Sequence, residues 1–319
     1  MGAPPDGPEL DLLVGQARAG RARAIGRLVS LVENHDRRLP TLMALLAADT
    51  GRARVIGLTG SPGVGKSTTV AALVTALRAR DERVAVLAVD PSSPFSGGAL
   101  LGDRVRMQTH ALDPQVFIRS MATRGHLGGL AVAAPQAIRV LDAAGFDTVL
   151  VETVGVGQSE VDVAGQVDAT LVLLAPGMGD GIQAAKAGVL EIGDLFVVNK
   201  ADRDGAHVVV RELRNMIALA QREPQDWKPP VLSTSAVDGT GVAELLVELD
   251  RFHAHASASG LLSQRRLDRA RREVESLVLA RLRAGLPVAG RAGLDGLAAE
   301  VSAGRLDAYA AADRVLNRS

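Results

Sequence analysis

Two short polar motifs have the residue types and spacing of a nucleotide-binding site. The first has the pattern GxxxxGK[ST] and consists of Gly60, Ser61, Pro62, Gly63, Val64, Gly65, Lys66 and Ser67. It lies between an apolar run and a segment with helical spacing, as a phosphate-binding loop requires. Glycines let backbone N–H groups surround phosphate oxygens, and the following helix, whose first turn includes Thr68, adds partial positive charge. Lys66 is expected to reach the β- and γ-phosphates.

The second motif, Asn199-Lys200-Ala201-Asp202, follows the apolar run 195–198. A carboxylate at Asp202 accepts hydrogen bonds from the N1–H and 2-amino groups of guanine, whereas adenine would place a lone pair against it. Lys200 is expected to pack its stem along the base. Ser235, Ala236 and Val237 follow the last apolar run, and backbone N–H groups of this turn can meet guanine O6. The two motifs together predict a site for GTP and GDP.

Acidic residues that end apolar runs predict a magnesium site. Glu152 ends the run 148–151 in the position of a Walker B carboxylate, and Ser67 supplies a hydroxyl. Asp90 and Asp103 are further candidate ligands, although a capping role is an alternative for Asp90 and a purely structural role is an alternative for Asp103.

The segment after Glu152 has the features of a switch. The N–H of Gly155 could meet the γ-phosphate, an interaction that hydrolysis would remove, and Gln158 could orient the attacking water. The candidate catalytic residues from this reasoning are Lys66, Glu152 and Gln158. His126 is interpreted as a loop hydrogen-bonding residue, and Arg104 and Arg106 as solvated or as contacts to phosphate or a partner.

Apolar runs that alternate with helical segments indicate how these residues are positioned. Seven such runs occur, at 55–59, 84–89, 116–118, 148–151, 170–174, 195–198 and 231–233. This pattern predicts an α/β fold, a doubly wound and mostly parallel sheet forming a P-loop G domain, with ligands at the carboxyl ends of the strands. We expect a helical segment at 1–50, the GTPase domain at 51–256 and a helical dimerisation arm at 257–319.

The arm begins with a long helix predicted over 261–282, which Gly285, Pro287, Gly290 and Gly293 are expected to break before two short helices. Its apolar stripe from Leu267 to Val278 could be a dimer surface or could pack on the G domain. The arginines between 265 and 272 are interleaved with acids, which favours a solvated helix face over a nucleic-acid surface.

Composition excludes several classes of protein. The chain has 319 residues, balanced charge with 36 basic and 36 acidic side chains, and no cysteine, so disulfides and thiolate metal sites are impossible. Neither a signal peptide nor a bilayer-spanning run is evident. Aromatic residues make up 2%, which argues against stacking of nucleic-acid bases. We expect a cytoplasmic protein that binds neither membrane nor nucleic acid.

Three segments resemble a known family, the MeaB/ArgK/MMAA GTPases of the SIMIBI class of P-loop NTPases. They are 89–93 (VDPSS), 101–107 (LGDRVRM) and 151–160 (VETVGVGQSE). The resemblance implies a G-protein chaperone that gates adenosylcobalamin delivery to methylmalonyl-CoA mutase or a similar acyl-CoA mutase. It also implies protection of the mutase, mutase-stimulated GTP hydrolysis and a homodimer formed largely through the C-terminal arm.

The family's third switch corresponds to residues 179–186, where Lys186 matches a lysine needed for partner-stimulated hydrolysis. The second lysine that the family often shows is replaced by Ala187. Two alternatives stay open from the residues alone. One is a nickel-delivery metallochaperone GTPase, and the other is a small-metabolite kinase that uses the same phosphate loop.

Overall fold

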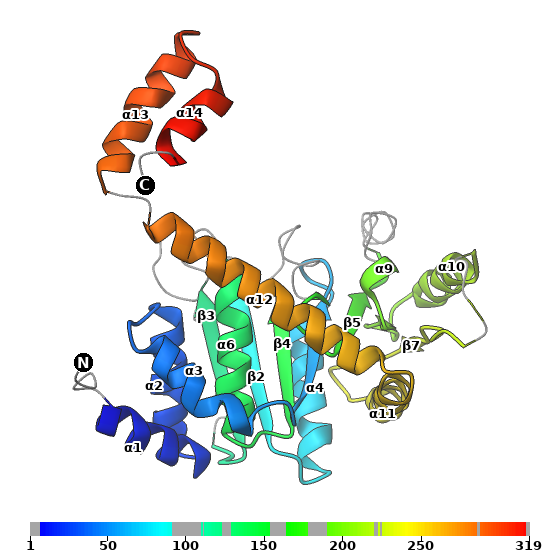
Figure 1. Ribbon diagram of the computed structural model, residues 1–319. Helices are drawn as coiled ribbons and strands as arrows, with labels where there is room; N and C mark the ends of the chain where they lie inside the picture. Colours follow the sequence, from blue (N-terminus) through cyan, green and yellow to red (C-terminus); the bar gives the residue numbers. More distant parts are fainter. Residues whose placement is uncertain are drawn as a thin grey trace. The chain divides into compact units, whose positions relative to one another are not determined.

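A seven-stranded sheet forms the centre of the structure, and all its neighbouring strands pair in parallel in the order β3-β2-β4-β1-β5-β6-β7 (Figure 1). The strands are β1 (Arg54–Thr59), β2 (Val84–Asp90), β3 (Val116–Ala122), β4 (Thr148–Thr153), β5 (Ala169–Leu174), β6 (Leu195–Val198) and β7 (Val231–Ser233). All seven predicted strands and the predicted doubly wound α/β fold are confirmed.

The computed structural model describes residues 7–90, 110, 112–122, 129–153, 164–177, 190–219, 223, 225–285 and 288–316. The helices are α1 (Gly7–Arg18), α2 (Ala22–Glu33), α3 (Leu39–Leu46), η1 (Ala47–Asp49), α4 (Lys66–Arg78), α6 (Gly129–Ala143), α9 (Leu190–Ile192), α10 (Ala206–Leu219), α11 (Val242–Ala258), α12 (Leu261–Gly285), α13 (Val288–Ser302) and α14 (Ala308–Leu316). In the part of the chain so described, none of these helices has the length and apolar character needed to cross a membrane.

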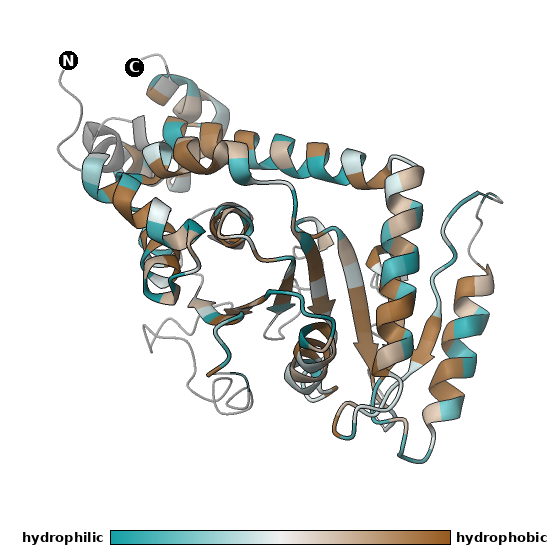
Figure 2. Cartoon of the chain, turned by 90° about the horizontal axis from the view of Figure 1, so that it is seen from below, coloured by the Kyte–Doolittle hydropathy of each residue, from teal (hydrophilic) through white to brown (hydrophobic). Residues whose placement is uncertain are grey.

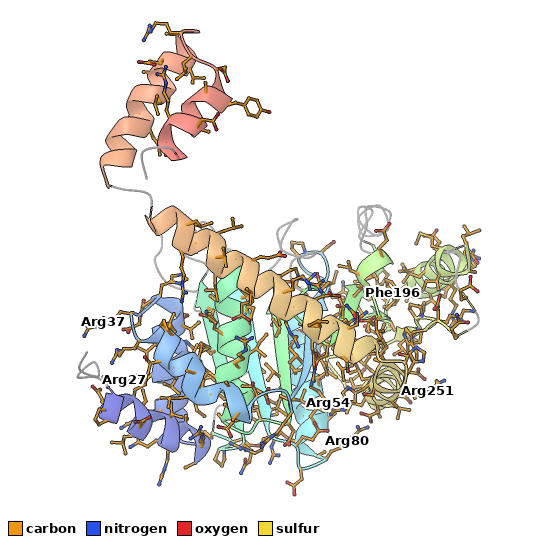
Figure 3. The ribbon with its side chains drawn as sticks, viewed as in Figure 1. Arg27, Arg37, Arg54, Arg80, Phe196 and Arg251 are labelled. Carbon is orange, nitrogen blue, oxygen red and sulfur yellow. The ribbon has the colours of Figure 1, made fainter. Side chains whose placement is uncertain are left out.

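Apolar layers cover both faces of the sheet, as the continuous apolar strands predict. On one face, α1, α2, α3 and α6 share a core with alternate residues of β1, β2 and β4. On the same side α10 packs on β5 and β6, where Phe196 is fully buried (Figure 3). On the other face, α4 and α11 cover the remaining residues of these strands. Hydropathy colouring shows the strands as mostly apolar between helices that carry both kinds of residue (Figure 2).

The chain forms two compact units, residues 1–270 and 271–319, which are described separately. The first unit contains the sheet, the N-terminal helices and the beginning of α12. The second contains the rest of α12 and the pair α13 and α14. The predicted domain boundaries after residues 50 and 256 stay predictions.

Two expectations about the C-terminal helices are wrong. Gly290 and Gly293 do not break the chain but lie inside α13. A glycine inside a helix costs only about 0.5–1 kcal/mol relative to alanine, which neighbouring residues can offset. The first arginines of α12 do not form a solvated face either, because Arg265, Arg266 and Arg269 pair with the buried Asp168 and Asp194. Arg271 and Arg272 are exposed, as predicted.

Candidate functional site

The predicted phosphate loop connects β1 to α4 at the centre of the sheet. Strands β2, β3 and β4 lie on one side of β1, and β5, β6 and β7 lie on the other. The strand order therefore reverses at β1, and open α/β sheets bind ligands at such a point. Helix α4 begins at Lys66 and directs its N-terminus into the loop. The Gly60–Ser67 motif therefore lies where its proposed chemistry requires.

Two loop glycines occupy positions that a side chain could not share. Gly60 has φ +140°, and a Cβ there would lie 2.3 Å from the carbonyl oxygen of Leu173. Gly65 has φ +97°, and a Cβ there would lie 2.3 Å from Nδ2 of Asn199. The phosphate loop is therefore in close contact with β5 and with the second motif.

The Lys66 side chain is folded over the loop. Its Nζ donates hydrogen bonds to the carbonyl oxygens of Gly60, at 2.6 Å, and Ser61, at 3.3 Å. Lys66 is the first residue of α4 and is only 7% exposed. Its buried charge therefore adds to the positive end of the helix dipole. A phosphate oxygen in the loop would meet this ammonium group and the backbone N–H groups of the first helical turn, which begins with Lys66, Ser67 and Thr68.

Ser67 and Glu152 form the centre of the predicted magnesium site. The hydroxyl of Ser67 donates to Oε1 of Glu152 at 2.6 Å, and Glu152, near the end of β4, is 2% exposed. A hydroxyl and a carboxylate are oxygen donors of the kind that magnesium prefers, so the pair fits this ion. The side chain of Asp90, which ends β2, lies outside the described residues. Asp103, Gly155, Gln158 and Lys186 also lie outside them, as do Arg104, Arg106 and His126.

Asn199 joins the second motif to the phosphate loop and to the turn after β7. Its Nδ2 donates to the carbonyl oxygen of Val64 at 2.8 Å. Its Oδ1 accepts hydrogen bonds from Oγ1 of Thr234, at 3.3 Å, and from the N–H of Ala236, at 3.1 Å. Asn199 is 2% exposed, so it acts as a structural link rather than as an open contact surface. Thr234 is also fully buried, and the sequence pattern indicates no role for its side chain.

Lys200 and Asp202 extend from the same loop. Nζ of Lys200 donates to the carbonyl oxygen of Gly63 at 2.7 Å, and Lys200 has a positive φ of 56°, which is uncommon for a residue with a side chain. Asp202 is solvent-exposed. The side chain of Lys200 thus reaches from the second motif to the phosphate loop.

The turn after β7 is held by its own hydrogen bonds. Ser235 donates its N–H to Thr240, and Asp238 accepts the N–H of Thr240 at 2.9 Å. Hydrogen bonds from Thr240 lower the pKa of Asp238. Val237 is 89% exposed beside this turn. The N–H of Ala236, which the sequence predicts to meet guanine O6, donates to Asn199 in this structure, so it would have to be shared with a base.

The described site residues therefore lie together at the carboxyl ends of the strands. They come from the carboxyl ends of β1, β4, β6 and β7, of which only β6 and β7 are consecutive strands in the sequence.

Comparisons with known proteins agree with this geometry. The family model described as "Methylmalonyl Co-A mutase-associated GTPase MeaB" matches residues 22–289. A protein of Mycobacterium tuberculosis named "Probable GTPase" is 44% identical over 275 residues, covering 84% of this chain and 82% of the relative. The mouse protein named "Methylmalonic aciduria type A homolog, mitochondrial" is 41% identical over 214 residues, covering 66% of this chain and 52% of the relative. A solved structure of an "LAO/AO transport system kinase" superposes with a TM-score of 0.71 at 27% identity, covering 99% of both chains.

Proposed function

Because the chain belongs to the family of methylmalonyl-CoA mutase-associated GTPases, we propose that it is a GTPase chaperone of an adenosylcobalamin-dependent acyl-CoA mutase. The chain is a GTP hydrolase of this family. The proposed chaperone role is to gate adenosylcobalamin loading into a mutase of the methylmalonyl-CoA type and to protect that enzyme. The description of the matching family, which names methylmalonyl-CoA mutase, supports this choice of partner.

The observation that best supports guanine-nucleotide binding is the link made by Asn199. It holds the phosphate loop at Val64 against the loop that carries Asp202, so one ligand can meet both. In the proposed complex, Asp202 accepts hydrogen bonds from guanine N1–H and the 2-amino group, and Lys200 covers the base. Ser235, Ala236 and Val237 line the O6 edge.

The phosphate end of the proposed site contains the reacting groups. Lys66 and the N–H groups of the loop hold the β- and γ-phosphates. Water adds to the γ-phosphorus, the bond to the β–γ bridging oxygen breaks, and GDP and phosphate leave, with the proton from water passing to phosphate. Gln158 is the proposed residue that orients this water, and the N–H of Gly155 is the proposed sensor of the γ-phosphate.

Magnesium would be held by Ser67 and Glu152, with Asp90 and Asp103 as further proposed ligands. When bound, it neutralises charge on the β- and γ-phosphates. The hydrogen bond between Ser67 and Glu152 holds both ligand oxygens in position before the ion binds.

Slow turnover by the protein alone and stimulation by the mutase are part of the proposal, with Lys186 as the residue that responds to the partner. We also propose a cytoplasmic homodimer that uses residues 257–319. Exposed apolar residues on α12 support a dimer, since Leu267, Val274 and Val278 are 54%, 60% and 49% exposed.

The test is GTP turnover with and without an adenosylcobalamin-dependent methylmalonyl-CoA mutase from the same host. We expect the mutase to accelerate hydrolysis in the wild type, and Lys186→Ala to bind GDP normally but respond weakly. A mutase that co-purifies with the chain would support the same conclusion. Unchanged turnover with every such mutase of the host would contradict the chaperone role, and phosphate transfer to a small metabolite would favour a kinase.

A further inference from the structure

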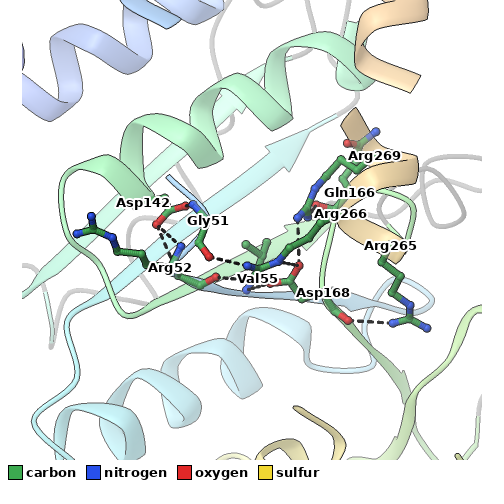
Figure 4. A network of polar contacts seen from close by, with 10 residues as sticks. Gly51, Arg52, Val55, Asp142, Gln166, Asp168, Arg265, Arg266 and Arg269 are labelled. Atoms are coloured by element: carbon green, nitrogen blue, oxygen red, sulfur yellow. Dashed lines mark hydrogen bonds and ion pairs between the residues drawn. The ribbon is translucent and has the colours of Figure 1, made fainter. Parts of the chain in front are cut away.

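Asp168 is a buried carboxylate at the base of the sheet, at the opposite ends of the strands from the candidate nucleotide site. It precedes β5, and its side chain is 4% exposed. It accepts hydrogen bonds from Arg266, at 2.8 Å, and Arg269, at 3.1 Å, both at the beginning of α12 (Figure 4). An ionised carboxylate is stable in such a place only when it is paired. Asp168 and the first turns of α12 therefore stabilise each other.

Arg266 also holds the segment that leads into β1. It donates to the carbonyl oxygens of Gly51, at 2.5 Å, and Ala53, at 3.2 Å. From the other side, Asp142 at the end of α6 accepts the N–H groups of Gly51, at 2.5 Å, and Ala53, at 2.9 Å (Figure 4). This segment is therefore fixed between α6 and α12.

The contact continues into β1 itself. The carboxylate of Asp168 accepts the N–H of Val55 at 3.2 Å, and the N–H of Asp168 donates to the carbonyl oxygen of Val55 at 2.7 Å. The base of β1 is thus bound directly to the residue that the arginines neutralise.

A second pair holds the base of β6. Arg265 donates through two nitrogens to Asp194, at 2.7 and 2.8 Å, and the same carboxylate accepts the N–H of Thr170 at 2.8 Å. The only tryptophan, Trp227, donates to the carbonyl oxygen of Asp194 at 2.8 Å. The ring of Phe252 lies 5.2 Å from that of Trp227 and 5.4 Å from the Arg265 guanidinium. Trp227 is therefore a natural optical reporter of this contact.

The strands held in this way are those that carry the two halves of the nucleotide site. Strand β1 leads to the phosphate loop at Gly60, and β6 leads to Asn199. Val55 and Gly60 are about 17 Å apart along an extended strand. Hydrogen bonds to neighbouring strands connect the two ends of β1 and of β6 within one parallel sheet.

We propose that Asp168 and Arg266 are positioning residues that couple the docking of the α12 root, residues 261–270, to nucleotide binding. The two states are the docked and the released root. Binding linkage is reciprocal, so bound nucleotide strengthens docking of the root, and release of the root weakens nucleotide binding. The coupling rests on the guanine-nucleotide binding proposed above.

The first experiment uses the wild-type protein and needs no variant. Amide hydrogen exchange is measured for peptides covering 261–270 without nucleotide and with saturating magnesium and GDP. We expect exchange in this segment to slow about tenfold with nucleotide, together with a change in Trp227 emission. Equal exchange in a protein shown by calorimetry to bind GDP overturns the coupling alone. A wild type that does not bind GDP overturns the proposed guanine-nucleotide binding and the coupling with it.

The second experiment compares Arg266→Gln with Arg251→Gln. Arg251 is an exposed arginine of α11 paired with Glu248, so it controls for loss of a surface charge. We expect Arg266→Gln to weaken GDP binding about tenfold and to reduce the Trp227 response, with Arg251→Gln unchanged. A folded Arg266→Gln protein with wild-type GDP affinity contradicts the proposal.

Arg266→Lys keeps the charge but cannot donate to Asp168 and two carbonyl oxygens in the same way, so it covers the case in which Arg266→Gln does not fold. Its GDP affinity should also fall, but by less than in Arg266→Gln. Wild-type affinity in that variant, with a normal Trp227 response, also contradicts the proposal.

Discussion

Asn199 donates a hydrogen bond to the carbonyl oxygen of Val64 across 2.8 Å and thereby connects two loops that are 135 residues apart in the chain. The loop of Val64 faces the proposed phosphates, and the loop of Asn199 faces the proposed base. The same amide accepts hydrogen bonds from Thr234 and Ala236. Three separate segments therefore share one buried side chain.

Replacing Asn199 with alanine should impair binding and folding together. Asn199→Ala leaves the buried carbonyl of Val64 and the N–H of Ala236 without this partner, at about 1–3 kcal/mol for each unsatisfied group. We expect GDP affinity to fall about 10–100-fold in calorimetry and the melting temperature to decrease. Asn215→Ala, on the exposed side of α10, is the control and should behave as wild type. Unchanged GDP affinity in Asn199→Ala would remove this link from the nucleotide site.

Asp202 should determine the choice of base. Asp202→Asn replaces a carboxylate acceptor by an amide that can donate to the 2-oxo group of xanthine. We expect the preference for GDP over XDP to fall about tenfold or more in competition binding. Asp204→Asn changes an exposed aspartate two residues away and serves as the matched control. A retained guanine preference in Asp202→Asn would exclude Asp202 from base recognition.

Replacing Glu152 should weaken magnesium binding more than it weakens the binding of nucleotide without magnesium. Glu152→Gln keeps the shape of the side chain that accepts from Ser67 but removes the negative charge. We expect the magnesium concentration needed to enhance GDP binding to rise about tenfold. The measurement is GDP affinity across a magnesium titration, with Glu244→Gln in an exposed turn of α11 as control. An unchanged magnesium requirement would contradict the assignment.

Two glycines with nearly equal φ angles allow the effect of backbone strain to be separated from that of the contact with Asn199. Gly65 has φ +97° and a Cβ position 2.3 Å from Asn199, whereas Gly51 has φ +98° and nothing within 4 Å. Gly51→Ala should cost about 1–2 kcal/mol in the free energy of unfolding. It should leave GDP binding intact, because alanine keeps the backbone N–H and C=O that pair with Asp142 and Arg266. Gly65→Ala should cost more, because Asn199 must move, and should weaken GDP binding at least about tenfold. Chemical denaturation and calorimetry measure both effects, and equal GDP affinities in the two variants would disprove the steric argument.

His253 should make stability depend on pH. Burial lowers its pKa from the ordinary value of 6.5, and the positive charge of Arg54 lowers it further. The unfolded chain then binds the proton more readily, so this contribution is complete above pH 6.5 and declines as the pH falls below it. We expect the loss of unfolding free energy between pH 6.5 and about pH 5 to be smaller in His253→Gln than in wild type. His207→Gln, at an exposed position, is the control, and an equally steep decline in His253→Gln would refute the prediction.

Much of the architecture could be read from local sequence pattern. Apolar runs flanked by helical segments predicted all seven strands, because a strand covered on both faces must be apolar along its whole length. Local pattern was a poorer guide to α13, because it predicted a break at Gly290 and Gly293, which lie inside the helix. The solvated face predicted for α12 is wrong for its first three arginines, because their partners Asp168 and Asp194 are about 70–100 residues away in the sequence.

The sequence alone determined the kinds of chemical group available: a glycine loop with Lys66 and Ser67, an acid at Glu152, and a carboxylate at Asp202 suited to guanine. The parallel sheet decided that these groups lie at the same end of the strands, because it places the carboxyl ends of strands distant in the chain side by side. Only the tertiary structure identified Asn199 as the link between loops and Arg266 as the residue that holds the segment leading into β1. Hydrogen bonds and ion pairs of this kind depend on distances between folded segments, and no residue pattern along the chain specifies those distances.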